Sequence, residues 1–289
     1  MPKISIDKIK IQGIVRNTRT IQKWYDSYCE RQNCVLVQEQ TRTLALNKYQ
    51  FAFTLTPVEN GVLQEGVVYF AWCWNGSYSN PRPNAHRFVI EYNPNKAPRG
   101  LIQDFKYFTK AEYKEILSLD LAFDYAVPRH YAIVSKCNRS YMAISRGDAL
   151  TEYLGYNNRH ARLKLYDKAK ERGITDPLTR VEVSITEGLS HLILTADKKH
   201  NLNSTILNSL EKVSNVLVCV SFYDPFVECD PLTRLLATAT PVERNIYINS
   251  LSNKTRAKYR STLRSVCSPV EYSALEIYDI IVERLGNIL

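Results

Sequence analysis

The chain has 289 residues, of which 45% are hydrophobic and 23% charged, so it is long enough for one large or two modest globular domains. Ten glycines and twelve prolines exclude a collagen-like or low-complexity protein. Lysine and arginine number 38 against 29 acidic residues, and the net charge of +9 makes nucleic acid the leading class of partner. The alternative is a basic protein whose charge serves only its solubility.

The sequence has no feature that indicates export or membrane insertion. Residues 1–15 alternate lysines with isolated apolar residues and lack the apolar run of a secretory signal. The longest apolar run, residues 216–222, is far shorter than the roughly 20 residues that span a membrane. Seven scattered cysteines show no C-x-x-C spacing. We therefore expect a cytoplasmic protein with reduced thiols and no membrane contact.

The first predicted element is a helix that ends near Glu30 and has two interpretations. Its cations contact DNA, or it is a solvated amphipathic helix that packs on the protein. The cations are Arg16, Arg19 and Lys23. The apolar residues are Ile21, Trp24 and Tyr25.

Strands follow, punctuated by turns. Residues 49–56, 67–74 and 88–92 are rich in aromatic and β-branched side chains, and Pro57 and the pair Asn60-Gly61 mark a turn. Thr109 and Glu112 have the spacing of a capping box, which predicts a helix to about Leu117. That helix would lead directly into a strand over residues 119–125.

The last third of the chain reads as helices. Residues 204–213 have helical spacing, and Asp230-Pro231 is a helix start. Residues 240–243 and 268–271 each fit a capping box. We predict an α+β fold in which a catalytic domain with a central antiparallel sheet, residues 1–200, precedes a small all-helical DNA-binding or accessory domain, residues 201–289.

Three strands of the middle region carry reactive groups on one face and apolar residues on the other. Residues 119–125 present Asp120 and Asp124. The strand over residues 161–166 presents Arg162, Lys164 and Tyr166. The strand over residues 178–185 presents Arg180, Glu182 and Ser184. An antiparallel sheet with one face in water gives the same alternation, but solvated faces favour Thr, Lys and Gln.

These groups suit metal-assisted phosphoryl transfer. Carboxylates hold Mg²⁺ or Mn²⁺, cations offset phosphate charge, and a hydroxyl attacks. A phenol has an ordinary pKa near 10, so a tyrosine nucleophile needs neighbouring cations. Lys164 and Lys168 are placed to supply them.

Several segments together resemble the rolling-circle replication initiators of Gram-positive plasmids and the related relaxases of integrative elements. Residues 153–156 read Tyr-Leu-Gly-Tyr, residues 162–171 read Arg-Leu-Lys-Leu-Tyr-Asp-Lys-Ala-Lys-Glu, and residues 179–182 read Thr-Arg-Val-Glu. Upstream, residues 119–124 resemble the family's strand with two aspartates, and residues 93–96 its Asn-Pro-Asn-Lys segment. The match covers roughly residues 45 to 190. Asp167 stands where many relatives have Asn, and Leu119 where they often have Arg.

The resemblance implies an enzyme that nicks one strand of origin DNA, in a hairpin or single-stranded, and joins its 5′-phosphate to a tyrosine. It implies Tyr166 as the nucleophile, and Lys168 and Arg180 at the scissile phosphate. Asp120 or Asp124, with Glu182, become metal ligands, while Glu171 is either a ligand or a partner of Arg180. The resemblance also implies a homodimer and a host helicase as partner.

Other side chains compete for these roles. The five histidines include no His-hydrophobe-His pair, so a carboxylate-based site is required, with His86 and His160 as supplementary ligands or structural residues. Tyr153 and Tyr156 are rival nucleophiles that rank below Tyr166. The alternative for Tyr166 is a purely structural role, because a tyrosine at a strand end usually packs with its hydroxyl in water.

A basic segment over residues 253–264 contains no acid. Arg256, Arg260 and Arg264 form one helical stripe that suits successive phosphates, and a solvated helix face is the alternative. The predicted DNA-binding residues are Arg162, Lys164, Lys254, Arg256, Lys258, Arg260 and Arg264, together with Arg234 and Arg244.

Three functions stay open at this point. The first is a nicking enzyme that starts replication of a plasmid or mobile element. The second is a non-catalytic origin-binding regulator, which the departure at Leu119 allows. The third is a relaxase for conjugative mobilisation, which shares the chemistry of the first.

Overall fold

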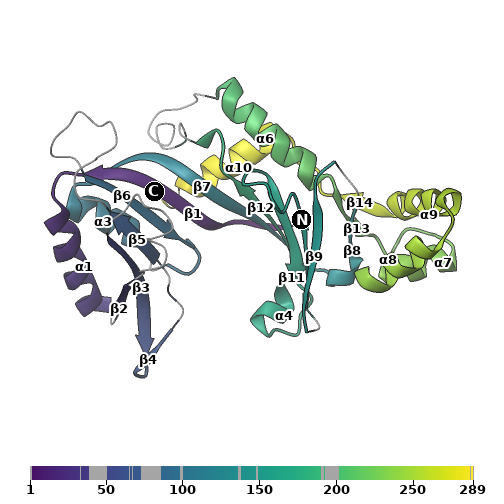
Figure 1. The fold of residues 1–289 in the computed structure, drawn as a ribbon, viewed down its shortest axis with the longest axis horizontal. Coiled ribbons are helices and arrows are strands. Elements are labelled where there is room, and N and C mark those ends of the chain that lie inside the picture. Colours follow the sequence, from purple (N-terminus) through teal and green to yellow (C-terminus); the bar gives the residue numbers. More distant parts are fainter. Residues whose placement is uncertain are drawn as a thin grey trace. The chain divides into compact units, whose positions relative to one another are not determined.

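The computed structural model describes residues 2–32, 34–38, 51–64, 66, 68–72, 86–97, 100–135, 138–147, 149–189, 192, 202–286 and 288. The chain forms two compact units, each assembled from separate segments (Figure 1). The first unit comprises residues 6–120, 186–206 and 279–289, and the second comprises residues 1–5, 121–185 and 207–278. An antiparallel sheet with helices concentrated in the last third of the chain confirms the predicted α+β class.

This division by compactness differs from the predicted boundary near residue 200. The strands of the middle region and most of the helical tail belong to the same unit. Compactness does not say which segment carries chemistry and which binds DNA. The assignment of residues 1–200 to catalysis and of residues 201–289 to DNA binding therefore stays a prediction.

The first unit is a sheet with the strand order β2-β3-β5-β6-β1-β7, to which β4 adds a short hairpin partner of β3. Its paired strands β2/β3, β3/β5, β5/β6 and β6/β1 are antiparallel. The elements are β1 Lys3–Val15, α1 Thr18–Gln32, β2 Cys34–Gln38, β3 Phe51–Glu59, β4 Val62–Leu63, β5 Val68–Trp72, β6 His86–Tyr92, α3 Leu101–Thr109 and β7 Glu112–Tyr125. Residues 49, 50, 67, 73 and 74 of the predicted strands lie outside the described residues.

Helix α1 is held by an aromatic cluster. Trp24 is fully buried, and its ring centroid lies 5.3 Å from that of Phe70 and 5.0 Å from that of Phe105 on α3. The indole Nε1 donates a 2.7 Å hydrogen bond to Asp104 Oδ2. Trp24, Ile21 and Tyr25 therefore pack as the amphipathic interpretation predicted.

The predicted helix over residues 109–117 is wrong. Thr109 ends helix α3, Lys110 turns the chain with a left-handed φ of 53°, and residues 112–117 are already part of strand β7. Gly13 of β1 explains how closely these strands approach, since a Cβ there would lie 2.4 Å from the carbonyl oxygen of Glu112. Pairing in the sheet overrides the local capping signal.

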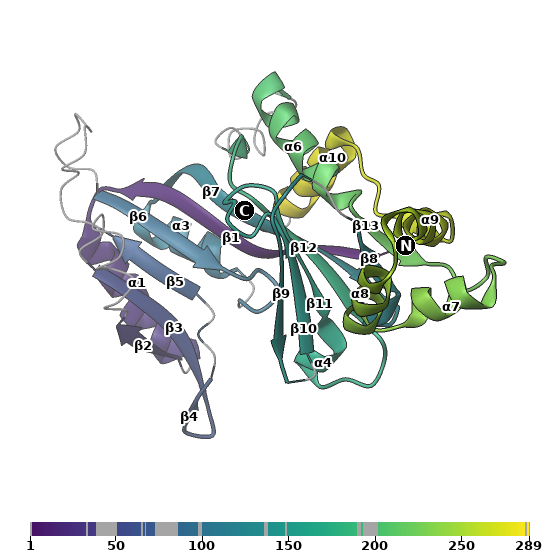
Figure 2. The same ribbon diagram turned by 45° about the vertical axis from the view of Figure 1, so that its right-hand side comes forward.

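The second unit contains two sheets. The larger has the order β7-β12-β11-β10-β9, and the smaller has β13 between β14 and β8. The elements are η1 Arg129–Tyr131, β8 Ala132–Val134, β9 Tyr141–Arg146, β10 Ala149–Leu154, β11 Arg162–Asp167, α4 Lys168–Arg172, β12 Thr179–Ile185, α6 Ser204–Leu217, β13 Val220–Tyr223, α7 Pro231–Thr238, α8 Pro241–Ser250, α9 Asn253–Ser265, β14 Cys267–Pro269 and α10 Ala274–Gly286. Helices α7, α8 and α9 gather beside β8, β13 and β14 (Figure 1). Figure 2 shows β9, β10, β11 and β12 side by side, with α4 at the end of β11.

Two of the three predicted helix starts in the tail are confirmed, and one is displaced. Asp230 caps α7, and Thr240 with Glu243 forms the capping box of α8. Ser268 instead belongs to β14, which pairs with β13, so that the last helix begins five residues later. There Ser273 and Glu276 exchange the two reciprocal hydrogen bonds of a capping box.

No helix in the described part of the chain is long and apolar enough to cross a membrane. Cys29, Cys219, Cys229 and Cys267 carry free thiols, as predicted. The side chains of Cys34, Cys73 and Cys137 lie outside the described residues.

Candidate active site

The register of strands β11 and β12 gathers four of the predicted site residues. Tyr166 lies opposite Arg180, and Lys164 lies opposite Glu182. Directly opposed residues of an antiparallel pair project to the same face, so these side chains share one face of the sheet. The polar faces predicted for the two strands therefore lie on the same side of the sheet.

Tyr166 stands at the centre of this group. Its side chain is buried, with 6% of its surface exposed, and its hydroxyl Oη donates a 3.3 Å hydrogen bond to Glu182 Oε2. Lys164 Nζ lies 4.1 Å from the centroid of the Tyr166 ring and 3.9 Å from Glu182 Oε2. The phenol thus has a carboxylate that can take its proton as a general base, and a cation whose charge stabilises a phenolate.

Lys168 approaches the same ring from helix α4. Asp167 caps this helix by accepting a 2.9 Å hydrogen bond from the backbone nitrogen of Lys170. The helix begins directly after β11, so Lys168 is the first residue beyond the strand, and its Nζ lies 5.6 Å from the Tyr166 ring centroid. The buried Lys168 ammonium pairs with Glu171. The partner of Glu171 in this structure is therefore Lys168 and not Arg180, and its role as a metal ligand stays a prediction.

Asp124 and Arg180 form a buried ion pair behind Tyr166. Arg180 Nε donates to Asp124 Oδ1 at 2.6 Å, and Nη2 donates to Oδ2 at 2.7 Å. The two residues are 8% and 2% exposed. Both oxygens of Asp124 are therefore held by one guanidinium, which fixes the position of Arg180 opposite Tyr166.

The metal-binding role assigned to Asp120 or Asp124 with Glu182 stays a prediction. Asp120 and Asp124 are both on β7, where Asp120 is half-buried, and Glu182 is on β12. Among the residues that the structure describes, no group of three or more His, Cys, Asp or Glu side chains could hold a metal ion. Asp124 would also have to share its oxygens with Arg180 in order to bind one.

Two histidines were proposed as supplementary metal ligands, and the structure describes the side chain of one of them, His160. His160 is buried, and its Nε2 lies 3.1 Å from the carbonyl oxygen of Ser209 and 3.2 Å from the Ser209 hydroxyl. This contact joins the end of the β10–β11 connection to helix α6. His86 lies in β6 opposite Val15, and its side chain falls outside the described residues.

The rival tyrosines differ in position. Tyr153 lies opposite Lys164 in the β10/β11 register and therefore shares the face of Tyr166. Tyr156 is 38% exposed beyond the strand end, and its ring meets that of Tyr153 edge-on at 5.4 Å. Tyr153 is consequently the closer rival, and it provides a matched control for Tyr166.

The Asn-Pro-Asn-Lys segment has a visible structural role. Asn93 Nδ2 donates to Asp7 Oδ1 at 3.1 Å, and Asn95 Nδ2 donates to the carbonyl oxygen of Ile6 at 2.8 Å. These bonds tie the turn after β6 to strand β1.

The cations predicted to bind DNA fall into two groups. Arg256 donates hydrogen bonds to the carbonyl oxygens of Ile248, Asn249 and Leu251, and so caps the end of α8. Arg244 does the same for α7 and is buried, with hydrogen bonds to the carbonyl oxygens of Leu236, Ala237 and Ala239. The other side chains are at least partly accessible, and they are Arg162, Lys164, Arg234, Lys254, Lys258, Arg260 and Arg264. Arg256 therefore has a structural role in the arginine stripe of α9, and DNA binding by the stripe stays a prediction.

A second cluster of charges was missed by the sequence analysis. On the other face of the same sheet, Glu152 accepts hydrogen bonds from Arg129 and, at 2.6 Å to Oε1, from the Tyr141 hydroxyl. Glu152 is 4% exposed. One signal was available, because Glu152 stands between Leu150 and Leu154 at the apolar positions of its strand.

Comparison with known proteins gives little further guidance. No protein-family model and no curated protein matches the chain. Among solved structures, a rolling circle replication initiator protein from Geobacillus stearothermophilus is similar at 13% sequence identity and a TM-score of 0.40, covering 81% of this chain and 91% of that one. A likeness this distant gives no information about the roles of the residues in the site.

Proposed function

We propose that this protein is a replication initiator of a plasmid or mobile element that nicks one strand of its origin by attack of Tyr166 on a phosphodiester. The observation that carries the proposal is the Tyr166 hydroxyl hydrogen-bonded to Glu182, with Lys164 against its ring. The motif resemblance around residues 153–182 and the net charge of +9 support the same class.

In the proposed reaction, Tyr166 Oη forms a bond to phosphorus while the bond from phosphorus to the 3′ oxygen breaks. The phenolic proton passes to Glu182, and the departing 3′ oxygen takes a proton from water. Lys164 and Lys168 stabilise the developing phenolate because their ammonium groups lie against its ring. The products are a 5′-phosphotyrosine link and a free 3′-OH that primes synthesis.

Arg180 has a positioning role in this proposal. The bidentate pair with Asp124 fixes the Arg180 guanidinium beside the nucleophile. To offset phosphate charge, Arg180 must turn some of its N–H groups toward the DNA. Arg162 and Lys164 extend the cationic row along β11 for the flanking phosphates. Dependence on Mg²⁺ or Mn²⁺, a helicase partner and a homodimer stay predictions.

The experiment is a denaturing gel of the protein mixed with labelled single-stranded oligonucleotides tiled across the DNA that flanks its coding sequence, with Mn²⁺ or with EDTA. We expect a covalent adduct with the native chain and with Tyr153→Phe, and none with Tyr166→Phe. Binding of the same oligonucleotide is expected to survive in all three. An adduct formed by Tyr166→Phe would refute the assignment, and an adduct formed equally in EDTA would refute the metal prediction.

One observation favours a second candidate, a non-catalytic origin-binding regulator. Tyr166 is buried and both oxygens of Asp124 are occupied by Arg180, which is an arrangement that a purely structural cluster would share. Specific binding of one tiled oligonucleotide without an adduct from any variant would favour this candidate. A conjugative relaxase shares the proposed chemistry, and transfer of the element to a recipient cell would distinguish it.

A further inference from the structure

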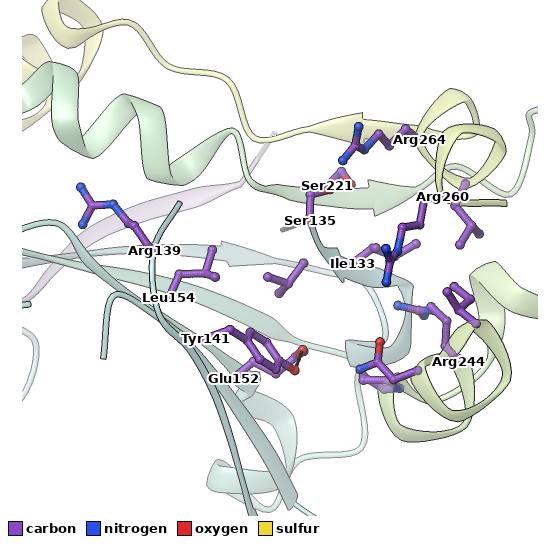
Figure 3. A pocket seen from close by; sticks show the side chains of 15 residues that line it. Ile133, Ser135, Arg139, Tyr141, Glu152, Leu154, Ser221, Arg244, Arg260 and Arg264 are labelled. Atoms are coloured by element: carbon purple, nitrogen blue, oxygen red, sulfur yellow. Dashed lines mark hydrogen bonds between the residues drawn. The ribbon is translucent and has the colours of Figure 1, made fainter. Parts of the chain in front are cut away.

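The second unit contains a pocket of about 380 Å³ that the proposed reaction does not use (Figure 3). It is lined by residues of β8, β9, β10 and β13 on one side and of helices α8 and α9 on the other. Glu152 and Leu154 of β10 line it, and they lie opposite Leu165 and Leu163 in the β10/β11 register. The pocket is therefore on the face of the sheet opposite to the face that carries Tyr166.

Guanidinium groups dominate one side of the pocket. Arg244 and Arg260 reach toward one another from α8 and α9, and Arg264 lies one turn beyond Arg260 (Figure 3). Within the described part of the chain, the side chains of Arg260 and Arg264 make no hydrogen bond or ion pair. Burial, together with the charge of Arg129, lowers the pKa of Arg244 to about 10. Cations held this close favour an anion between them, and guanidinium geometry suits phosphate.

The opposite side of the pocket carries a carboxylate. Glu152 Oε1 accepts from the Tyr141 hydroxyl and Oε2 accepts from Arg129, yet each carboxylate oxygen can accept more than one hydrogen bond. Its remaining capacity suits a donor such as an exocyclic amine. Figure 3 places Tyr141 and Glu152 on the side of the pocket away from Arg260 and Arg264.

Apolar side chains separate these two sides. In Figure 3, Ile133 lies between the carboxylate and Arg260, whereas Leu154 lies beside Tyr141 on the carboxylate side, and Ile248 and Leu263 also line the pocket. The order is therefore cation, apolar wall and acceptor. A ligand that matches it carries a phosphate at one end, a flat apolar body, and an amine at the other end.

We propose that this pocket binds one nucleoside phosphate, with its phosphate at Arg260 and Arg244, its base against Ile133 and Leu154, and its exocyclic amine donating to Glu152. Two sources supply this chemistry, a free nucleotide or an unpaired nucleotide of bound DNA. The site does not depend on Tyr166. A base that presents an acceptor to Glu152 in place of an amine is disfavoured, so thymine binds about tenfold more weakly than cytosine.

The test is isothermal titration of the full chain with dCMP, dTMP, inorganic phosphate and the pentanucleotide of deoxycytidine. We expect dCMP to bind about tenfold more tightly than dTMP and phosphate. Arg260→Ala should weaken dCMP binding at least tenfold. Arg172→Ala removes the same charge from an exposed position of helix α4, outside the pocket, and should leave dCMP binding unchanged.

Each outcome decides a separate point. Equal binding of phosphate and dCMP, an equal loss in Arg172→Ala, or no binding of any probe would overturn the proposal. If the pentanucleotide displaces dCMP and binds more tightly, the natural ligand is a nucleotide of bound DNA. If the pentanucleotide does not displace dCMP, the natural ligand is a free nucleotide. Tyr166→Phe should bind dCMP as the native chain does, so failure of the nicking proposal leaves this result intact.

Discussion

The two faces of the sheet formed by β9–β12 carry charges that originate in different ways. The face with Tyr166 draws its groups from adjacent strands, in which Lys164 and Tyr166 are two residues apart and lie opposite Glu182 and Arg180. The face with Glu152 is apolar along β11, and its charges come from η1 and from helices α8 and α9, far along the chain. Alternation within a strand therefore predicts the first group but not the second.

Both faces also contain one buried ion pair, and these pairs are placed differently. Asp124–Arg180 supports the nucleophile face, and Arg129–Glu152 supports the pocket face. Because the Asp124–Arg180 pair is buried, we expect its loss to lower the stability of the protein as well as its activity.

The largest expected effect on stability is that of Asp124→Ala. Removing this carboxylate leaves the buried Arg180 guanidinium without its bidentate partner, so we expect the free energy of unfolding to fall by about 3–5 kcal/mol. Urea unfolding followed by circular dichroism measures it. A loss below about 1 kcal/mol would mean that Arg180 finds another partner and that the pair does not hold this face together.

Glu182→Gln is expected to separate chemistry from binding. The amide keeps the shape of the side chain but is a far weaker proton acceptor, so adduct formation should slow by about 10²-fold. Single-turnover kinetics on the gel of labelled oligonucleotide measures this rate, and filter binding provides the control. A variant that nicks at the native rate would remove Glu182 from the proposed proton transfer.

Arg256→Ala distinguishes a structural arginine from its neighbours on α9. Three carbonyl oxygens at the end of α8 lose their charged donor, and we expect a loss of about 1.5–3 kcal/mol of stability. Lys258→Ala on the exposed side of the helix should change stability by less than about 0.5 kcal/mol. Similar values for the two variants would contradict the capping role.

The smallest expected effect concerns alkaline pH. Burial and the nearby Glu152 carboxylate raise the pKa of Tyr141 above its ordinary value of 10.0, so the native state keeps a proton that the unfolded state loses near pH 10. The unfolded state then binds fewer protons, and stability falls as pH rises above 10. Tyr141→Phe should lose stability less steeply between pH 9 and pH 11. An unchanged slope would show that Tyr141 does not contribute to this dependence.

The sequence predicted the fold class and the strands that form the candidate site, because β11 and β12 each have a period-2 alternation. It failed where pairing with distant segments overrides a local signal. The capping-box spacing at Thr109 and at Ser268 is present, but both segments complete a sheet instead. Strand β1 has isolated apolar residues between lysines and was not predicted, since its partners β6 and β7 begin more than 80 residues away.

The candidate site shows the same limit. Tyr166, Lys164, Arg180 and Glu182 are brought together as their spacing suggested. The partner of Asp124 could not be read from the sequence, because an aspartate on a strand face gives no indication of whether a metal or an arginine binds it. The pocket could not be predicted either, since it depends on helices that are some 90 residues from Glu152 along the chain.

The discontinuity of the second unit has a consequence for synthesis in the cell. The strands that hold Tyr166 lie within residues 121–185, but the unit also requires residues 207–278. A ribosome must therefore make most of the chain before this unit can fold completely. Until then, the strands that carry Tyr166 lack the helices that pack against their sheet. A nascent chain stalled before residue 207 should consequently be far more sensitive to protease across β9–β12 than the released protein.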